Sequence, residues 1–570
     1  MAKNIKTLTF CLGLILSLGL GMHGWNQLYP ASPFTNHLYL TIQLFTLESG
    51  HVDDSSVIPL SLELARYLAP LTTASGILLA LHQFLLIEGR NAKRKMLKNH
   101  IIIVGGNERA LTLGRDLKAA GSKVMILLTT EGSNVAEYCW NEGFIAVEVS
   151  ESAQNLIEIA RLKHASRVIV FTEDDYTNLK LALTFKAGRK EGNIPIAINL
   201  DSEELCHTVQ NQYDFIYAFN YYRCVSRVLL SQYPLEAFPE VASCSDEDTD
   251  IRLIITHWDL LSKAFLYQVA KVGHYKNCQK VKVYLVCDQA ELVNELITTA
   301  YPNIRHCIDL EVRESRNQEL IPNIIIQLLH SFPDNALTTI LYLSDAPEDS
   351  FAGSARVKEK CALGHRTRML IPQSPLSNSA GEKHLLILPE STVFCNANIL
   401  LNDSIDMLAS TIHANWYKAT GKRLNEAQES NDENTIQRLH QNPYFKPWDK
   451  LKNAQKEENR AAADHMAVKL RSLGLKETDP VNLELVHLER AVDSIDEAQM
   501  EILSGMEHRR WSAVKWMTGW ELGARDDTAK KHPDLISYDD LSDATKQYDR
   551  DQVRGIIDLV KKIQSAYPSS

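Results

Sequence analysis

Hydrophobic residues follow two patterns along this chain: long uninterrupted runs near the N-terminus, and shorter periodic stretches after residue 98. Thr7 to Gly24 is rich in Leu, Ile, Phe and Gly, contains no Asp, Glu, Lys or Arg, and follows Lys3 and Lys6. A run of this length just suffices to cross a bilayer. A cleaved signal peptide has a similar pattern, but no small-x-small cleavage site stands out after this run.

A second apolar segment over residues 58–87 contains Glu63, Arg66 and His82. A basic cluster follows it: Arg90, Lys93, Arg94, Lys95 and Lys98. Positive residues beside membrane spans favour the cytoplasmic side. Residues 1–98 are therefore predicted to form a transmembrane hairpin, with spans at about 7–24 and 58–87, residues 25–57 outside, and both termini and all large domains in the cytoplasm.

The outer loop contains a predicted short helix, Phe34 to Phe45, and a possible pore segment. The order of span, short helix, Thr-led turn and span is that of two-helix potassium channels, but the Thr-Val-Gly-Tyr-Gly filter is absent. A ring of Glu48, with Asp53 and Asp54 nearby, would attract cations without strict selection. The pore candidates are Thr46, Glu48, Ser49 and Gly50. An outer loop without a pore is the alternative.

From His100 the pattern changes to short apolar strands alternating with helical stretches. The predicted strands are 101–104, 124–128, 145–149, 168–171 and 195–200. This alternation predicts a Rossmann-like, doubly wound parallel sheet over residues 99–240.

A glycine turn after the first strand is a possible nucleotide site, made of Gly105, Gly106, Asn107 and Arg109, with Glu131 as the nearest carboxylate. In the dinucleotide pattern Gly-x-Gly-x-x-Gly, the second Gly lets the pyrophosphate approach closely. Asn107 stands there, Ala110 replaces the third Gly, and no acidic residue ends the second strand. We expect a structural, dimerising and force-transmitting role for this domain, and nucleotide binding at the turn stays open.

The stretch from Ala165 to Leu179, with its Thr-Glu-Asp-Asp turn and following Asn-Leu, resembles the TrkA-N or regulator-of-potassium-conductance (RCK) domains of prokaryotic channels and transporters. Residues 251–400 look like a second, degenerate copy, in which His257-Trp258-Asp259 replaces the glycine turn. Related channels have eight such units in a gating ring. The resemblance therefore implies a homo-oligomer, a tetramer, in the bacterial inner membrane.

Residues 401–458 are predicted as a helix, Asn402 to Lys418, followed by a polar connector, and residues 459–570 as a small, mainly α-helical domain. That last domain closely resembles the ryanodine-receptor repeat (RyR) domain. The motifs that carry the resemblance are Glu507-His508-Arg509-Arg510-Trp511, Gly519-Trp520-Glu521-Leu522-Gly523, His532-Pro533-Asp534-Leu535 and Tyr548-Asp549-Arg550-Asp551.

The residue types in these motifs suit a small-molecule nucleotide ligand. Indole rings offer a face to a base, cations bind phosphate, and a carboxylate accepts from an amine or a ribose hydroxyl. The candidate ligand-binding residues are Arg510, Trp511, Lys515, Trp520, His532, Tyr538 and Asp549. Alternatively, the two Trp residues are core and the charges form a solvated network.

Composition narrows the function further. With 71 Asp and Glu against 60 Lys and Arg, the net charge of −11 disfavours nucleic acid as a partner. The ten Cys show no zinc-type spacing, and we expect no metal site. No hydrolase, P-loop or metalloprotease motif occurs, so we expect no catalytic residues, no enzyme activity and no required cofactor.

Together these patterns predict a ligand-gated membrane cation channel that opens on binding a nucleotide or nucleotide-derived messenger. The combination of membrane spans with a RyR-like domain suggests a role as an effector in bacterial nucleotide-signalled antiviral defence. The alternative is a non-conducting membrane-anchored receptor or scaffold.

The predicted topology is testable with reporters. Fusions after Lys98 and after Ser570 should both report a cytoplasmic location, and a cysteine introduced at Asp53 should react with an impermeant thiol reagent in intact cells. Reaction of that cysteine only after permeabilisation would contradict the hairpin.

Overall fold

The computed structural model describes residues 2–48, 57–129, 133–149, 156–188, 194–238, 249–361, 363–374, 384–401, 403–479 and 483–566. The chain divides into two compact units, residues 1–98 and residues 99–570, which are described separately below.

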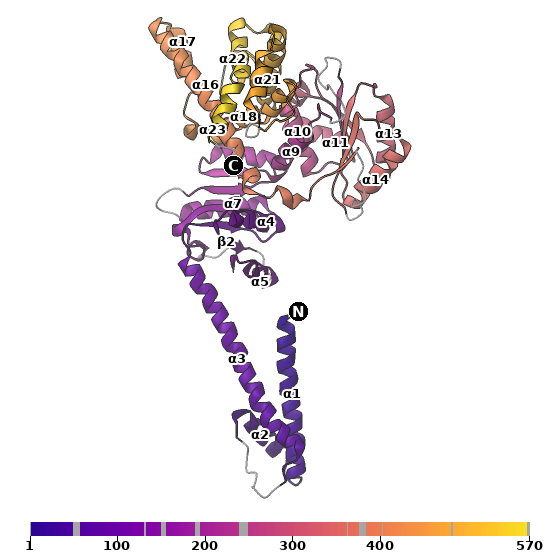
Figure 1. The fold of residues 1–570 in the computed structure, drawn as a ribbon, viewed down its shortest axis with the longest axis vertical. Helices are drawn as coiled ribbons and strands as arrows, with labels where there is room; N and C mark the ends of the chain where they lie inside the picture. The colour runs from indigo at the N-terminus through magenta and orange to yellow at the C-terminus, as the bar shows by residue number, and fades with distance from the viewer. Residues whose placement is uncertain are drawn as a thin grey trace. The chain divides into compact units, whose positions relative to one another are not determined.

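The N-terminal unit is a helical hairpin. It consists of α1 (Ala2–Leu28), α2 (Phe34–Gln43), the 3-10 turn η1 (Leu44–Thr46) and α3 (Leu60–Met96), with α1 and α3 side by side (Figure 1). The predicted short helix is thus present as α2, and α1 and α3 are both longer than the predicted spans. Since α3 continues to Met96, most of the basic cluster lies on its last turns.

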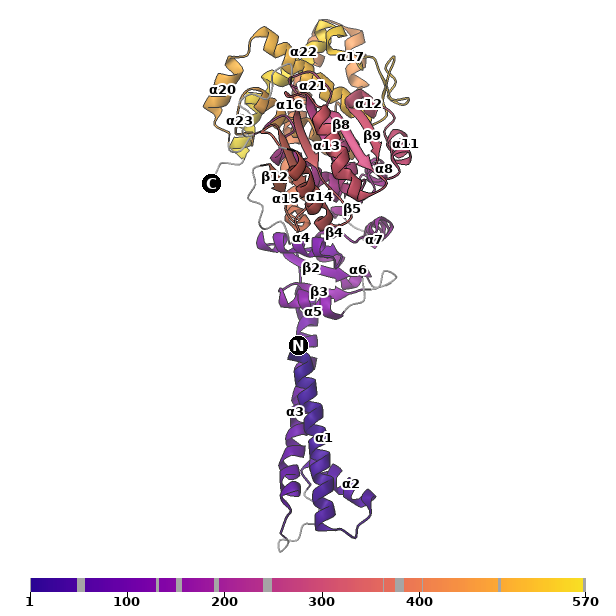
Figure 2. The ribbon, with the colours of Figure 1, turned by 90° about the vertical axis from the view of Figure 1, so that its right-hand side faces the viewer.

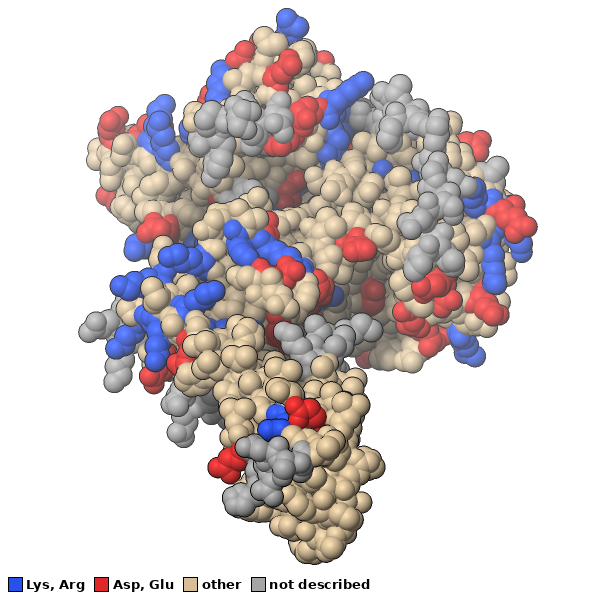
Figure 3. Space-filling model, turned by 60° about the horizontal axis from the view of Figure 1, so that its bottom comes forward, with Lys and Arg blue, Asp and Glu red and all other residues tan. Residues whose placement is uncertain are grey.

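Leu8–Leu28 and Leu60–Met96 are long and apolar enough to cross a membrane. Their apolar side chains face outward within this unit, as at Leu12 (64% exposed) and Leu78 (65% exposed). The face of the hairpin seen in Figure 3 carries few charged side chains. Apolar surface of this extent needs a cover of lipid or protein, because soluble proteins rarely expose it to water.

A small core closes the hairpin where α1, η1 and α3 meet. It contains Trp25, Leu44, Leu62, Ala65 and Ala69, all almost fully buried. Gly24 permits this contact, because a Cβ atom at its position would lie 2.5 Å from the Leu62 Cβ.

The first sheet of the second unit has six parallel strands in the order β3-β2-β1-β4-β5-β6. This is the order of a doubly wound nucleotide-binding fold. The strands are β1 (His100–Val104), β2 (Lys123–Leu128), β3 (Ile145–Glu148), β4 (Ala165–Val170), β5 (Ile196–Asn199) and β6 (Ile216–Phe219). The helices are α4 (Glu108–Ala119), α5 (Ser133–Asn141), α6 (Leu156–Ile159), α7 (Asp175–Gly188), α8 (Glu203–Gln212) and α9 (Tyr221–Gln232).

The second sheet repeats this topology. Its strands are β7 (Ile251–Thr256), β8 (Lys282–Cys287), β9 (Asp309–Glu314), β10 (Leu337–Leu341), β11 (Thr367–Ile371) and β12 (Leu385–Ile387). The order β12-β11-β10-β7-β8-β9 is that of the first sheet, read from the opposite edge. Its helices are α10 (Leu260–Val272), α11 (Ala290–Ala300), α12 (Ile304–Cys307), α13 (Ile321–Ser331) and α14 (Pro347–Lys360). The predicted degenerate copy of the fold is confirmed.

The turn after the first strand is also repeated, although its sequence is not. Gly105 and His257 each directly follow their strand and have positive φ angles of 146° and 66°. Two residues later, Asn107 and Asp259 each cap the following helix with their side chains. The second copy therefore keeps a positive φ angle and a side-chain cap at this turn without glycine.

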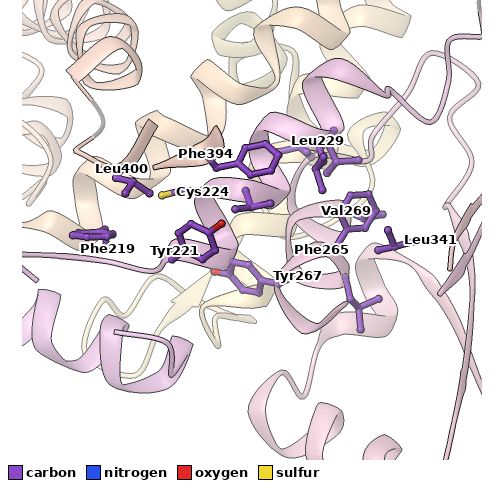
Figure 4. Close-up of a cluster of buried hydrophobic side chains, with 14 of the residues drawn as sticks. Phe219, Tyr221, Cys224, Leu229, Phe265, Tyr267, Val269, Leu341, Phe394 and Leu400 are labelled. Atoms are coloured by element: carbon purple, nitrogen blue, oxygen red, sulfur yellow. The ribbon is translucent and has the colours of Figure 1, made fainter. Parts of the chain in front are cut away.

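The two α/β domains share one core through α9 and α10, which pack against each other. Figure 4 shows Tyr221 and Leu229 of α9 near Phe265 and Val269 of α10. Phe394 and Leu400 complete this core from η5 (Ser391–Phe394) and α15 (Ala397–Leu400), which return to the first domain after β12.

The remaining chain is almost entirely helical. Its helices are α16 (Asp403–Glu429), α17 (Glu433–His440), α18 (Asn453–Asp464), α19 (Met466–Ser472), α20 (Leu485–Asp493), α21 (Glu497–Met517), α22 (Asp543–Arg554) and α23 (Ile556–Ala566). The helix expected to end at Lys418 continues to Glu429. The segment expected as a polar connector contains α17 and the start of α18.

The close approach at Gly24 generates a stability prediction. Gly24→Ile should destabilise the hairpin by about 1–3 kcal/mol, because the added side chain overpacks against Leu62. Gly19→Ile is the matched control, since no atom lies within 4 Å of a Cβ at that position. Protease resistance of residues 2–98 in detergent measures the effect, and equal resistance of the two variants would contradict the packing.

Candidate functional site

A cavity of about 350 Å³ lies between the RyR-like segment and the helices that precede it. Its walls come from α16, α17, α18, α21 and α22, which gather in the same part of the unit in both views (Figures 1 and 2). Its volume falls at the lower end of the range for small-molecule sites. The predicted residues that line it are Arg510, Trp511, Lys515, Trp520, His532 and Asp549.

Lys515 lies at the centre of the lining. Its Nζ donates to both carboxylate oxygens of Glu458, at 2.9 and 3.0 Å, and to the Tyr444 hydroxyl at 3.2 Å. The ammonium also lies 4.4 Å from the centre of the Trp520 ring. The positive charge of Lys515 is therefore neutralised by an internal partner rather than free for a phosphate.

Aromatic rings form a second part of the lining. His532 meets Trp511 edge to face at 4.9 Å and Trp520 at 6.2 Å, and His508 stacks on Trp511 at 5.5 Å. Burial lowers the pKa of His532 to about 4, and the nearby Asp534 carboxylate opposes this only in part. His532 is thus a neutral ring at pH 7, and this wall suits an aromatic group.

Arg510 is held in a buried ion pair. Its Nη2 donates to Glu507, whose carboxylate also lies 2.6 Å from Lys469 Nζ. Burial alone would raise the pKa of Glu507, but Arg510 and Lys469 outweigh burial and hold the pKa well below its usual value. The Nε of Arg510 is buried and has no acceptor among the described residues.

Asp549 lines the cavity beside His508, with its Oδ2 3.5 Å from the ring Nδ1. Burial raises the pKa of Asp549. The other ring nitrogen of His508 donates to the Ile536 carbonyl at 3.0 Å. These contacts fix the imidazole beside the carboxylate.

Tyr538 does not line the cavity. Its hydroxyl donates to Glu501 at 3.0 Å, and its ring packs on His508 at 6.1 Å. Tyr538 therefore supports the wall from behind.

Several lining residues lie outside the sequence-predicted set. His413, Trp416, Tyr444 and Glu458 come from the segment expected as a helix and polar connector. The aromatic residues within that polar stretch were the available signal, since large rings are seldom left in water.

In the glycine turn of the first α/β domain, side chains of the protein itself make the contacts that a bound phosphate would make. A Cβ atom at Gly105 would lie 2.3 Å from the Phe171 carbonyl oxygen, so this position requires glycine. Asn107 accepts from the Ala110 amide at 2.8 Å and donates to the Phe171 carbonyl at 3.0 Å. The asparagine thus uses one of the amides at the helix N-terminus, where a phosphate would bind.

The other predicted residues near this turn are also engaged or lie outside the described ranges. Arg109 donates to the Tyr222 hydroxyl at 3.1 Å and lies 4.2 Å above the Tyr221 ring. Gly106 follows Gly105 in the turn. Glu131 lies outside the described residues.

The acidic turn after β4, which carries the resemblance to TrkA-N domains, links the ends of β4 and β5. Asn178 is fully buried and bonds both Thr172 and the Asn199 carbonyl. Asp175 accepts from the amides of Asp201 and Ser202. This motif is therefore structural here.

The pore candidates are described only in part. Thr46 belongs to η1 and donates to the Gln43 carbonyl at 2.8 Å. Glu48 is exposed and accepts from the Gln43 side chain at 3.3 Å. Ser49 and Gly50 lie outside the described residues.

Two family models match this chain. The TrkA-N domain model matches residues 101–216, and the RyR domain model matches residues 477–565. Both resemblances drawn from the sequence are confirmed. No curated protein matches the chain.

Solved structures of one protein, GsuK, also match. "Crystal structure of the GsuK bound to ADP" is 16% identical, with 70% of this chain and 97% of that chain covered and a TM-score of 0.35. "GsuK Channel" is 16% identical, with 70% and 98% covered and a TM-score of 0.36. "Crystal Structure of the GsuK RCK domain" is 13% identical, with 55% and 79% covered and a TM-score of 0.36. The domain assignment rests on the two family models.

Proposed function

We propose that this chain, which joins a TrkA-N domain and a RyR domain to two helices apolar enough to cross a membrane, is a ligand-gated cation channel. The ligand is a nucleotide or a nucleotide-derived messenger. The observation that carries the proposal is the convergence of Arg510, Trp511, Lys515, Trp520 and Asp549 on one cavity.

The cavity lining favours a ligand with an aromatic base and little net charge. Trp511, Trp520 and the neutral His532 ring provide faces and edges for stacking. Charged side chains of both signs line the cavity: Arg438, Arg510, Lys515, Arg525, Glu458, Glu507, Asp534 and Asp549. This balance suits a nucleoside carrying one phosphate better than a polyphosphate.

The site is joined directly to the second α/β domain. Asn303 donates to the Trp520 carbonyl at 3.1 Å, and His306 of α12 stacks on Trp516 of α21 at 4.4 Å. A change at the Trp520 wall therefore reaches this domain through a hydrogen bond and a ring stack.

In the proposed assembly, four chains surround a pore in the bacterial inner membrane, with the α/β domains in the cytoplasm. Thr46 and Glu48 would then meet at the symmetry axis. Cation flow on ligand binding would depolarise the cell, which is the proposed role in nucleotide-signalled defence. A receptor that binds the same ligand without conducting is the rival.

The ligand site is tested by calorimetric titration of the full-length protein against mono-, di- and cyclic nucleotides. A fragment beginning at Asn459 would lack Tyr444 and Glu458 of the lining. A base stacked on Trp511 should contribute about 1–3 kcal/mol. Trp511→Ala should therefore weaken binding by about tenfold.

Lys515→Ala should weaken binding similarly, since it also leaves Glu458 as an unpaired carboxylate in the cavity. Trp258→Ala, a Trp outside the cavity, is the matched control and should bind as the wild type does. If Asn107→Ala abolishes binding while Trp511→Ala does not, the sensor lies in the first α/β domain instead.

Conduction is tested in planar bilayers. Glu48→Gln should lower cation conductance or change ionic selectivity without altering assembly, because a ring of carboxylates concentrates cations at a pore mouth. Glu63→Gln, the same change on α3, controls for a general surface-charge effect. A wild-type protein that assembles and binds ligand yet never passes current would favour the receptor.

A further inference from the structure

Helix α18 carries two neighbouring carboxylates that have different environments. Glu458 lines the ligand cavity and pairs with Lys515. Glu457, the preceding residue, lies in a buried ionic cluster outside that cavity, 3.2 Å from Lys271 Nζ of α10 and 3.3 Å from Arg460 Nη1.

The same helix is tied to both α/β domains. The Arg223 guanidinium of α9 lies 4.0 Å from Glu457. At the last residue of α18, Asp464 accepts from Arg227 of α9 and, at 2.9 Å, from Gln268 of α10. α18 is therefore bound by charge to the two helices through which the α/β domains share their core.

The ionic cluster makes these connections rigid. Burial alone would raise the pKa of Glu457, but Arg223 and Lys271 outweigh it and hold the pKa well below its usual value. Removing one member of a buried ion pair leaves an uncompensated charge, which is strongly destabilising. Separating α18 from α9 and α10 would carry this cost.

The two members of the Lys515–Glu458 pair differ in freedom. Lys515 has a side chain only 5% exposed and is surrounded by the rings of Trp511, Trp520 and Tyr444. The Glu458 side chain is 20% exposed. An incoming anion therefore finds a fixed cation and a carboxylate that can turn toward solvent.

We propose that the Lys515–Glu458 ion pair is the switch of the ligand site: an anionic group of the ligand replaces the Glu458 carboxylate on Lys515, and α18 carries the displacement to α9 and α10. This proposal rests on the proposed function and names its regulation. The Tyr444 hydroxyl donates to Glu458, so Tyr444 moves together with that carboxylate in the proposed switch.

If Glu458 is part of a switch, removing its charge should raise the affinity for an anionic ligand. If Glu458 only supports the cavity wall, the same change should lower that affinity. If Glu458 competes with the ligand for Lys515, Glu458→Gln should tighten binding of adenosine monophosphate to the full-length protein by about tenfold. Binding of adenosine, which has no anionic group, should change by less than about twofold. Glu489→Gln is the matched control, because Glu489 forms a 2.8 Å pair with Lys561 in the same domain but does not line the cavity.

Transmission is measured by hydrogen exchange in the full-length protein without ligand. Glu458→Gln should raise amide exchange in residues 260–272 of α10, and Glu489→Gln should leave it unchanged. In Lys271→Met, Arg223 and Arg460 still neutralise Glu457, so adenosine monophosphate should bind but should alter exchange in α10 less than in the wild type.

Weaker binding of adenosine monophosphate to Glu458→Gln would overturn the switch while leaving the proposed ligand site standing. An equal change for adenosine would overturn it too. If no nucleotide binds the wild type, the proposed function fails, and the exchange experiment still decides the inference: unchanged α10 exchange in Glu458→Gln refutes it.

Discussion

The buried carboxylates of α18 hold the second unit, residues 99–570, together. Glu457 and Asp464 lie between cations and an amide contributed by α9 and α10, so one helix joins both α/β domains to the segment that forms the candidate cavity. Charges buried in this way are costly unless every partner is in place. The relative positions of the three parts are consequently set by a few ion pairs rather than by apolar packing alone.

Much of the fold was predictable because buried parallel strands are short apolar runs. Ile102 and Met125 are fully buried, and the strands that contain them match the predicted strands 101–104 and 124–128. The edge strands β6 and β9 were missed, and β9 shows why: its sequence Asp-Leu-Glu-Val-Arg-Glu puts charge at alternate positions, which suits an exposed edge but not a hydrophobic criterion. The helical periodicity of residues 401–458 was also hard to recognise, because this segment is mostly polar.

Only the part of the candidate site that lies in the RyR-like segment was predictable from the sequence. Trp511 and Lys515 are one helical turn apart on α21, so local spacing brings them together. Glu458 and Tyr444 reach Lys515 across 57 and 71 residues, and no local pattern encodes such pairs. Tyr538 illustrates the opposite error: it was a candidate ligand-binding residue, but its ring packs on His508 and does not line the cavity.

The repeated strand order has an evolutionary consequence. When two like domains belong to separate identical chains, every substitution occurs in both, and a site that one copy needs cannot be lost from the other. Here the two copies are covalently joined, so each can drift independently. His257 in the left-handed turn of the second copy and Asn107 in the first are outcomes that such independence permits. Both copies share the strand order and the helix cap, although neither has the full glycine pattern.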